Sequence, residues 1–316
     1  MQDKHKLWIL VVAVIALAAW ILGKGLTPDN YQFFLSRRIP KVLAIVIASV
    51  GISVSSLIFQ TITNNRILTP SIMGFDSLYL LSQVLMVALF GGMSSVMINP
   101  QLNFVASTAV MLLFSSVLFG LYFRRDGVNI FTLLLIGVIC GSLFGSMASF
   151  LMMVMDPNEF MTVQANMFAS FNNVNAELVY WCLIPMAAAL FWLLHRSPTL
   201  DVFWLGSDNA TSLGVDTCKL SREMMLIIAI LISVSTALVG PVLFFGLIVV
   251  ALTRQVFQSY QHNLLIVASS TLAIFMLLSG QWVVENVLSF ETTISVIINF
   301  CGGIYFLFLL LRNKLN

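Results

Sequence analysis

The residue types that most often do chemistry are sparse in this chain and lie far apart. Its three histidines are His5, His195 and His262, and none belongs to an HExxH motif. The sequence also lacks a GxxxxGK[ST] phosphate loop, so we do not expect it to bind and hydrolyse ATP in the usual way. We therefore predict that the chain is not an enzyme, and that any ATP-driven work depends on an ATPase in another chain.

The four cysteines show no spacing typical of a metal site or a disulfide framework. They are Cys140, Cys182, Cys218 and Cys301, and no CxxC pair occurs. Three of them lie in or near apolar runs, which is typical of small core residues. We predict no metal site and no cofactor bound by this chain.

Acidic residues are nearly absent from the long apolar stretches. Asp76 lies near the start of one stretch and Glu285 near the end of another. A carboxylate in the first turn of a helix is stabilised by the helix dipole, which would account for Asp76. A proton- or sodium-coupled carrier normally places a carboxylate in the middle of the membrane, so this pattern argues against secondary transport.

The composition indicates that most of the surface faces lipid. Of the 316 residues, 59% are hydrophobic and only 9% are charged, whereas soluble domains have roughly 25% charged residues. The apolar runs are long and do not alternate with polar residues, so they favour helices over the strands of a membrane barrel. We predict an all-α integral membrane protein, and the net charge of +2 gives no sign of a nucleic-acid partner.

The apolar runs divide into ten predicted transmembrane helices within one domain, residues 1–316. Each span needs about 20 mainly apolar residues. The predicted spans are residues 7–26, 39–62, 70–91, 102–123, 130–155, 176–194, 221–240, 242–257, 263–285 and 292–311. The eighth is short and contains glycine, so we expect it to be tilted or to cross only part of the bilayer.

Basic residues in the loops predict the orientation, since cytoplasmic loops are rich in Lys and Arg. If the N-terminus is an uncleaved, cytoplasmic first span, most of the 15 basic residues lie inside and both termini are cytoplasmic. The exceptions all lie between the first and second spans; they are Lys24, Arg37, Arg38 and Lys41.

The largest predicted cytoplasmic loop, about residues 197–220, has the signals of a short docked helix. Asp208, Thr211 and Ser212 are candidate helix-start residues, and Gly214 is a candidate stop.

Three further motifs each allow a structural and a functional interpretation. Gly137, Gly141 and Gly145 share one helix face, which suits either plain helix packing or a helix lining a pathway at a dimer axis. Asn64 and Asn65 precede Thr69-Pro70 and form either an ordinary turn or a gate at the cytoplasmic mouth.

The third of these motifs is the sequence RIPK at residues 38–41, which opens the second span. Its basic side chains either extend to the membrane interface or form a docking patch for an acidic partner on the outer face.

Four motifs, in order and with conserved spacing, resemble the FecCD-type permeases of ABC importers for siderophores, haem and cobalamin. The family patterns R-[LI]-P-R, Q-x4-N-P-L-A-x-P-x2-L-G, L-G-x3-A-x2-L-G-[VL] and G-P-I-x-F-[VI]-G-L-I-V-P-H are matched by residues 38–41, 60–74, 205–215 and 240–251. The chain departs from these patterns at Lys41, Arg66 and Val250-Ala251, and Cys301-Gly302-Gly303 replaces a common G-A-P. These departures indicate a divergent subgroup, and the chain looks most similar to permeases for catechol-type siderophores of Vibrio-like bacteria.

The resemblance implies a type II ABC importer permease fold and a set of partners. These are a second permease subunit, identical or related, two cytoplasmic ATPase subunits where ATP and Mg act, a periplasmic binding protein, a ferric siderophore and the lipid bilayer. By the same resemblance, Arg37, Arg38 and Lys41 dock the binding protein, and the ATPase couples to Leu205, Gly206, Ala210, Leu213 and Gly214. The second, fifth and tenth spans line the pathway in relatives, and the fifth carries Gly137, Gly141 and Gly145. Asn65 and Ile67 match positions near the cytoplasmic gate, and we assign Asn64 beside them to the same gate.

We therefore predict the membrane-spanning permease subunit of an ATP-driven importer in the bacterial inner membrane, which moves a ferric siderophore from periplasm to cytoplasm. A cobalamin or haem permease of the same family is the nearest alternative. A proton-coupled secondary transporter and a membrane-embedded enzyme remain as alternatives of other classes.

Overall fold

The computed structural model describes residues 2–123, 130–172, 174–289 and 292–314, and within these ranges the chain is helical and has no strand. The all-α prediction is thus confirmed. Arg124 and Arg125, two of the basic residues predicted to lie on the cytoplasmic side, are outside the described residues. The elements are α1 (Gln2–Gly23), α2 (Tyr31–Ile62), η1 (Pro70–Met73), α3 (Phe75–Phe90), α4 (Ser95–Ile98), α5 (Pro100–Tyr122), α6 (Ile130–Val154), α7 (Pro157–Met167), α8 (Ala176–Phe203), α9 (Ser207–Ser212), α10 (Thr217–Val239), α11 (Phe245–Val256), α12 (His262–Asn286) and α13 (Ile294–Lys314).

Each of the ten predicted spans coincides with a long or apolar helix of the structure. Seven described helices, α1, α2, α5, α6, α8, α10 and α12, are long and apolar enough to cross a membrane. Three shorter apolar helices, α3, α11 and α13, match the other predicted spans. The eighth predicted span becomes α11, which has only 12 residues, as the expectation of an incomplete or tilted crossing requires.

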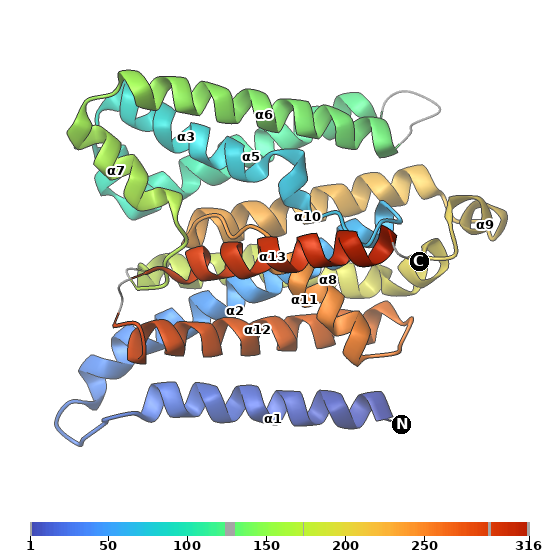
Figure 1. Ribbon diagram of the computed structural model, residues 1–316, viewed down its shortest axis with the longest axis horizontal. Helices are drawn as coiled ribbons and strands as arrows, with labels where there is room; N and C mark the ends of the chain where they lie inside the picture. The colour runs from blue at the N-terminus through green and yellow to red at the C-terminus, as the bar shows by residue number, and fades with distance from the viewer. Residues whose placement is uncertain (1, 124–129, 173, 290–291, 315–316) are drawn as a thin grey trace.

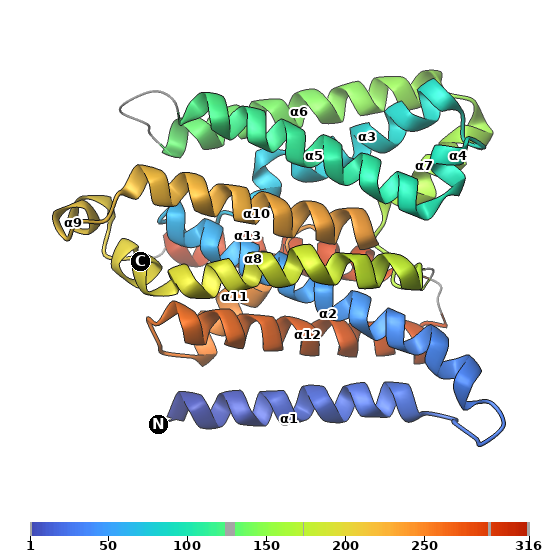
Figure 2. The same cartoon turned by 180° about the vertical axis from the view of Figure 1, so that it is seen from behind.

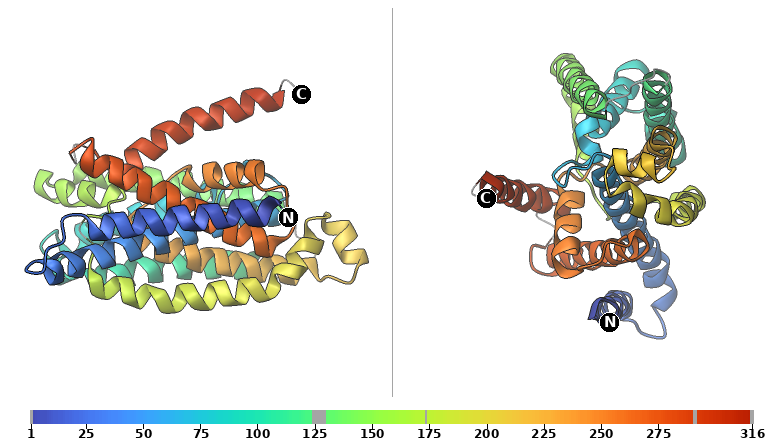
Figure 3. Two further views of the ribbon diagram at one scale, coloured as in Figure 1. Left: turned by 90° about the horizontal axis from the view of Figure 1, so that it is seen from below. Right: turned by 90° about the vertical axis from the view of Figure 1, so that its right-hand side faces the viewer.

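The long helices lie side by side along the longest axis of the molecule (Figure 1). One end of this bundle carries both chain termini and α9, which projects beyond the other helices (Figures 1 and 2). α13 leans away from the rest of the bundle, so that much of its length stands apart (Figure 3). The arrangement places the predicted coupling segment and both termini at one end, called here the α9 end.

α2 lies at the centre of the bundle and is buried over most of its length. It packs against α8, α10, α11 and α12, and small residues allow these helices to come close. A Cβ atom added at Gly246 of α11 would clash with Ser56 Oγ of α2, and one added at Gly51 of α2 would clash with Ser235 Oγ of α10. By contrast, α1 has no buried residue in its apolar window and packs at the edge of the bundle, against α12 and α2.

Two helices extend further than their apolar runs predicted. α8 continues past residue 194 to Phe203, so the connection begins near Trp204 and not at residue 197. Ser197 and Leu200 are fully buried, and Ser197 Oγ lies 2.6 Å from Asn263 Oδ1 of α12, so tertiary contacts extend the helix beyond Pro198. α2 likewise begins at Tyr31, eight residues before the predicted start, and carries Pro40 in its interior.

The prediction that the cysteines are core residues is correct for one and wrong for two. Cys182 is fully buried in α8, whereas Cys218 and Cys301 are exposed and Cys140 is half-buried. All four are free thiols. The apolar residues next to Cys218 and Cys301 in the sequence did not reveal whether each thiol faces the inside of the bundle or its surface.

The glycine face of α6 receives the backbone of η1 from the same chain. A Cβ atom at Gly137 would lie 2.9 Å from Met73 Cα, and one at Gly141 would lie 2.8 Å from Gly74 Cα. Gly74 itself has φ = +83°, a conformation that glycine adopts readily and other residues rarely do. The packing interpretation of Gly137 and Gly141 therefore has a defined partner, while the pathway role of this face remains a prediction, as it does for Gly145, where an added Cβ would meet only Ser77 Oγ at 3.7 Å.

We predict that Gly141→Ala destabilises the protein, because its Cβ would meet backbone atoms that cannot move aside as a side chain can. Overpacking of this kind costs roughly 1–3 kcal/mol. Gly120→Ala in α5 is the matched control, since a Cβ there meets nothing within 4 Å. Thermal unfolding of the purified variants in detergent measures the effect, and equal melting temperatures for Gly141→Ala and Gly120→Ala would contradict the close approach.

Candidate functional site

The connection between α8 and α10 folds as a short helix seated on the bundle. Gly206, with φ = +100°, turns the chain out of α8, and α9 follows directly at Ser207. Ala210 on the inner side of α9 is fully buried, and α9 contacts α8 and α10. The predicted docked helix is therefore confirmed.

The end of α9 has the hydrogen bonds of a Schellman motif. The N–H of Gly214 donates to the carbonyl of Thr211 at 2.9 Å, and the N–H of Val215 donates to the carbonyl of Ala210 at 3.0 Å. Gly214 has φ = +85°, so its prediction as the stop is confirmed. Thr211 was wrong as a helix start, as was Ser212: both lie in the last turn, where their hydroxyls donate back to carbonyls of the first turn.

Two leucines flank α9 and face outward. Leu205 is 57% exposed and Leu213 is 64% exposed, although they are large apolar residues at the polar end of the bundle. Exposed apolar side chains gathered on one protruding element are typical of a protein-binding surface. The coupling residues predicted by resemblance thus fall into three groups. Ala210 is buried against the bundle, and Leu205 and Leu213 are exposed. Gly206 and Gly214 form the turns at the two ends of α9.

The asparagines after α2 end that helix and turn the chain. Asn64 adopts the left-handed conformation with φ = +47°, and its N–H donates to the carbonyl of Thr61. The Asn65 N–H donates to the carbonyl of Gln60, and Asn65 Oδ1 accepts the N–H of Ile67 at 3.0 Å. These bonds account for both asparagines as turn residues, and the gate role of Asn64, Asn65 and Ile67 remains a prediction.

A buried histidine ties the end of α2 to the helix that leads into α9. His262, at the start of α12, has Nε2 2.9 Å from Thr61 Oγ1 of α2. Its Nδ1 lies 2.6 Å from Asp201 Oδ1 of α8, and its backbone N–H donates to the same oxygen. Three helices therefore meet at one polar cluster between the turn after α2 and the base of α9.

Sequence reasoning missed this cluster. His262 was noted only as distant from the other histidines, and Asp201 was assigned to a loop. Nothing local in the sequence pairs residues 61, 201 and 262, because only the packing of α2, α8 and α12 brings them together.

At the opposite end, two of the three predicted docking residues have partners in the same chain. Arg38 Nη1 donates to the carbonyls of Leu22 and Lys24 at 3.0 and 2.6 Å, where a cation suits the negative end of α1. Lys41 forms an ion pair with Glu285 of α12. Arg37 is exposed and lies 4.7 Å from the centroid of the Phe33 ring.

Asp76 lies in the first turn of α3, as the helix-dipole interpretation requires. It lines a small cavity with Ser56, Ser71 and Thr69. In the described part of the chain, no three His, Cys, Asp or Glu side chains gather in a way that could hold a metal ion.

Known proteins share both the sequence pattern and the architecture of this chain. Residues 7–312 match the model of the FecCD transport family. The petrobactin import system permease protein YclO of Bacillus subtilis is 48% identical, over 99% of this chain and 99% of its own length. The petrobactin import system permease protein FatC of Bacillus anthracis is 32% identical over 99% of this chain and 91% of its own. Both relatives come from Bacillus, whereas the resemblance pointed to Vibrio-like bacteria.

Among solved structures, a metal-chelate type ABC transporter in an inward-facing conformation superimposes with a TM-score of 0.85. The two are 22% identical, and the match covers 98% of this chain and 99% of that one. At 22% identity this similarity shows that the two chains share a fold. The shared fold agrees with the predicted permease fold. With a family model that matches almost its whole length and with full-length relatives, this multi-pass membrane protein belongs to the FecCD transport family.

Proposed function

We propose that the chain is the membrane-spanning permease subunit of an ATP-driven importer for a ferric siderophore of the petrobactin class. The observation that carries this proposal is the 48% identity to a petrobactin permease along 99% of both chains. Identity at this level, with no missing segment, favours a shared substrate class over the cobalamin and haem alternatives.

The α9 end is the cytoplasmic end in this proposal. Arg66 in the turn after α2 and Lys219 and Arg222 in the first turns of α10 lie there, in keeping with the excess of basic residues on the cytoplasmic side. Both termini lie at the same end, so both are cytoplasmic (Figure 1). The end with Arg37, Arg38 and Lys41 then faces outward, where a binding protein would deliver the siderophore.

α9 is the element to which a separate ATPase subunit attaches. It projects from the bundle, exposes Leu205 and Leu213, and is fixed at its base through Ala210. A force applied to α9 would reach the end of α8, and from there the Asp201–His262–Thr61 contacts lead to the turn after α2. This route links the motor to the predicted gate without any bond-making by this chain.

The outer basic residues contribute unequally to docking of the binding protein. Arg38 and Lys41 are engaged within the chain, so they hold the outer ends of α1, α2 and α12 in place. The exposed Arg37 guanidinium is free to meet an acidic side chain.

A second permease subunit completes the pathway. α13 leans away from its own bundle and exposes apolar side chains, among them Phe300 at 70% and Leu307 at 60%. A membrane helix with so little contact to its own chain suits packing against a partner subunit or lipid.

The proposal is tested by uptake of radioactive iron bound to petrobactin in a strain from which the gene for this chain is deleted. We expect uptake to fall to background and to return with a plasmid copy. Depletion of ATP should abolish it, since the energy comes from hydrolysis. Unchanged uptake in the deletion strain, or loss of cobalamin uptake alone, would reject the substrate class. Uptake that survives ATP depletion but stops with an uncoupler would reject the ATP-driven mechanism.

Leu213→Glu is predicted to reduce uptake at least tenfold while the protein still inserts and folds. The side chain is largely exposed, so a charge there costs little in the isolated subunit but is placed in the apolar contact with the ATPase. Ser212→Ala is the control on the same turn, because it removes only a hydrogen bond to the carbonyl of Asp208. The measurements are uptake, membrane abundance and co-purification of the ATPase, and normal co-purification with Leu213→Glu would overturn the role of α9.

A further inference from the structure

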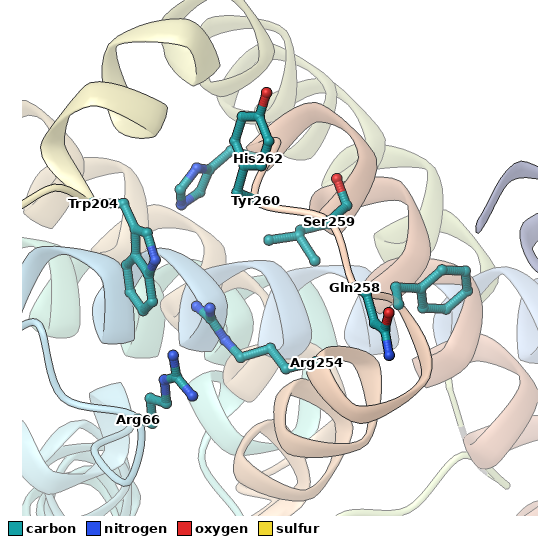
Figure 4. A pocket seen from close by; sticks show the side chains of 9 residues that line it. Arg66, Trp204, Arg254, Gln258, Ser259, Tyr260 and His262 are labelled. Atoms are coloured by element: carbon teal, nitrogen blue, oxygen red, sulfur yellow. The ribbon is translucent and has the colours of Figure 1, made fainter. Parts of the chain in front are cut away.

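A pocket of about 220 Å³ opens at the α9 end, where the ends of α2, α8 and α11 meet the start of α12 (Figure 4). Its lining is unusually cationic and aromatic for so small a space. The side chains that matter here are Arg66, Trp204, Arg254, Ser259, Tyr260 and His262. No function described above places a ligand in this pocket, although His262 also belongs to the polar cluster with Thr61 and Asp201.

Two arginines share one aromatic ring in this pocket. The guanidinium carbon of Arg254 lies 4.3 Å from the centroid of the Trp204 ring, and that of Arg66 lies 5.7 Å from it. The view in Figure 4 shows both guanidinium groups turned toward Trp204 and the pocket. Within the described residues neither arginine has an acidic partner. Two like charges are thus gathered without a salt bridge to either of them in the described structure.

Asp201 borders this region but is already engaged. Its Oδ1 receives the backbone N–H of His262 and lies 2.6 Å from the ring Nδ1. The carboxylate therefore neutralises neither arginine by direct contact.

Arg254 also has donors that are sheltered from solvent and have no acceptor. Its Nε and Nη2 atoms have almost no accessible surface and make no hydrogen bond in the described structure. A contact with the face of Trp204 stabilises the cation but does not satisfy N–H groups, which point outward in the guanidinium plane. Sheltered charged donors without an acceptor are costly, so Arg254 gains from any group that offsets its charge.

We propose that this pocket binds a phosphate-type oxyanion, held by Arg66 and Arg254. The planar fork of N–H groups on arginine matches two oxygens of a phosphate at once, and two such forks from different segments can converge on one group. Ser259 and Tyr260 also line the pocket, but their hydroxyl groups are turned away from the two guanidinium groups (Figure 4). The volume exceeds the roughly 30 Å³ that one water occupies in the liquid several times over.

Two sources could supply this chemistry. One is a soluble phosphate, either inorganic or part of a nucleotide, and the other is the headgroup of an anionic phospholipid. Both present the same oxygens to the arginines.

An anion bound in this pocket would link elements that lie on the proposed route from α9 to the turn after α2. Trp204 directly precedes Leu205 and Gly206, which lead into α9, and Arg66 belongs to the turn after α2. A phosphate bridging Arg66 to Arg254 offsets their repulsion and holds the turn after α2 against the end of α11, where Arg254 lies over Trp204 at the base of α9. The proposal does not depend on the transported substrate or on the ATPase.

The test is thermal unfolding of the purified protein in detergent, with chloride replaced by inorganic phosphate at constant ionic strength. We expect a saturable rise in melting temperature of about 2–4 °C, since a ligand that binds only the folded state stabilises it. Arg254→Gln and Arg66→Gln should each weaken the apparent affinity about tenfold or more. Arg222→Gln, an exposed arginine at the same end, is the matched control and should behave as the unmodified protein.

The variants are compared only after gel filtration shows monodisperse protein. If Arg254→Gln does not fold, the exposed Arg66 provides the test alone, because its side chain is not part of the core. Arg254→Lys keeps the charge but loses the fork, and it should retain a weakened response to phosphate.

The same measurement in lipid nanodiscs separates the two sources. If phosphatidylglycerol discs give an Arg254-dependent stabilisation over phosphatidylcholine discs, and added phosphate then has no effect, the headgroup is the ligand. If phosphate stabilises the protein equally in both discs, the ligand is soluble. No stabilisation by either source would overturn the proposal, as would an equal response in Arg66→Gln and the unmodified protein. Arg254-dependent stabilisation by an added ATPase subunit, with none by phosphate, would assign the arginines to a protein carboxylate and would also overturn it.

Discussion

Lipid offers no hydrogen bonds, and this constraint governs where the chain may leave the helical conformation. Backbone N–H and carbonyl groups in a bilayer must be satisfied within helices or inside the protein. The break at η1 and Gly74 is therefore pressed against the glycine face of α6, where no side chain intervenes. The break between α10 and α11 is enclosed in the same way: Gly240, with φ = +93°, lies against the Ala169 backbone, and the carbonyl of Val239 accepts the N–H of Ser170.

The α9 end is joined to the bundle by short turns and by polar contacts at its base. α8 passes from the bundle into α9 with a single turn at Gly206, and the Schellman motif at Gly214 returns the chain directly into α10. The base of α9 is tied to α2 and α12 by Thr61, Asp201 and His262. Beside it lies the cationic pocket of Arg66 and Arg254, so polar contacts are concentrated where the proposed motion enters the membrane domain. Elsewhere the described bundle is held mainly by apolar packing around α2.

Hydropathy predicted the helices well because lipid imposes the same requirement on every span. A run of apolar residues long enough to cross the bilayer has few alternatives, so all ten predicted segments correspond to helices. The prediction failed where tertiary contacts override local composition. α8 continues through Pro198 because Ser197 and Leu200 pack into the protein, and Cys301 is exposed although its neighbours are apolar. The turn chemistry of Gly214 was visible in the sequence. The partners of Lys41 and His262 come from helices distant in sequence, and those of Arg38 are backbone carbonyls at the end of α1, so local patterns did not reveal them.

The central claim is that α9 lies on the cytoplasmic side, where a motor made of other chains can reach it. Asn209 is exposed on α9 and suits a single-cysteine probe in a variant whose four native cysteines are replaced by serine or alanine. We predict that Asn209→Cys resists a membrane-impermeant thiol reagent in intact cells and reacts once the membrane is permeabilised. A second probe, Gln32→Cys at the other end of the bundle, should react in both cases. Labelling of residue 209 from outside intact cells, with residue 32 protected, would contradict the account.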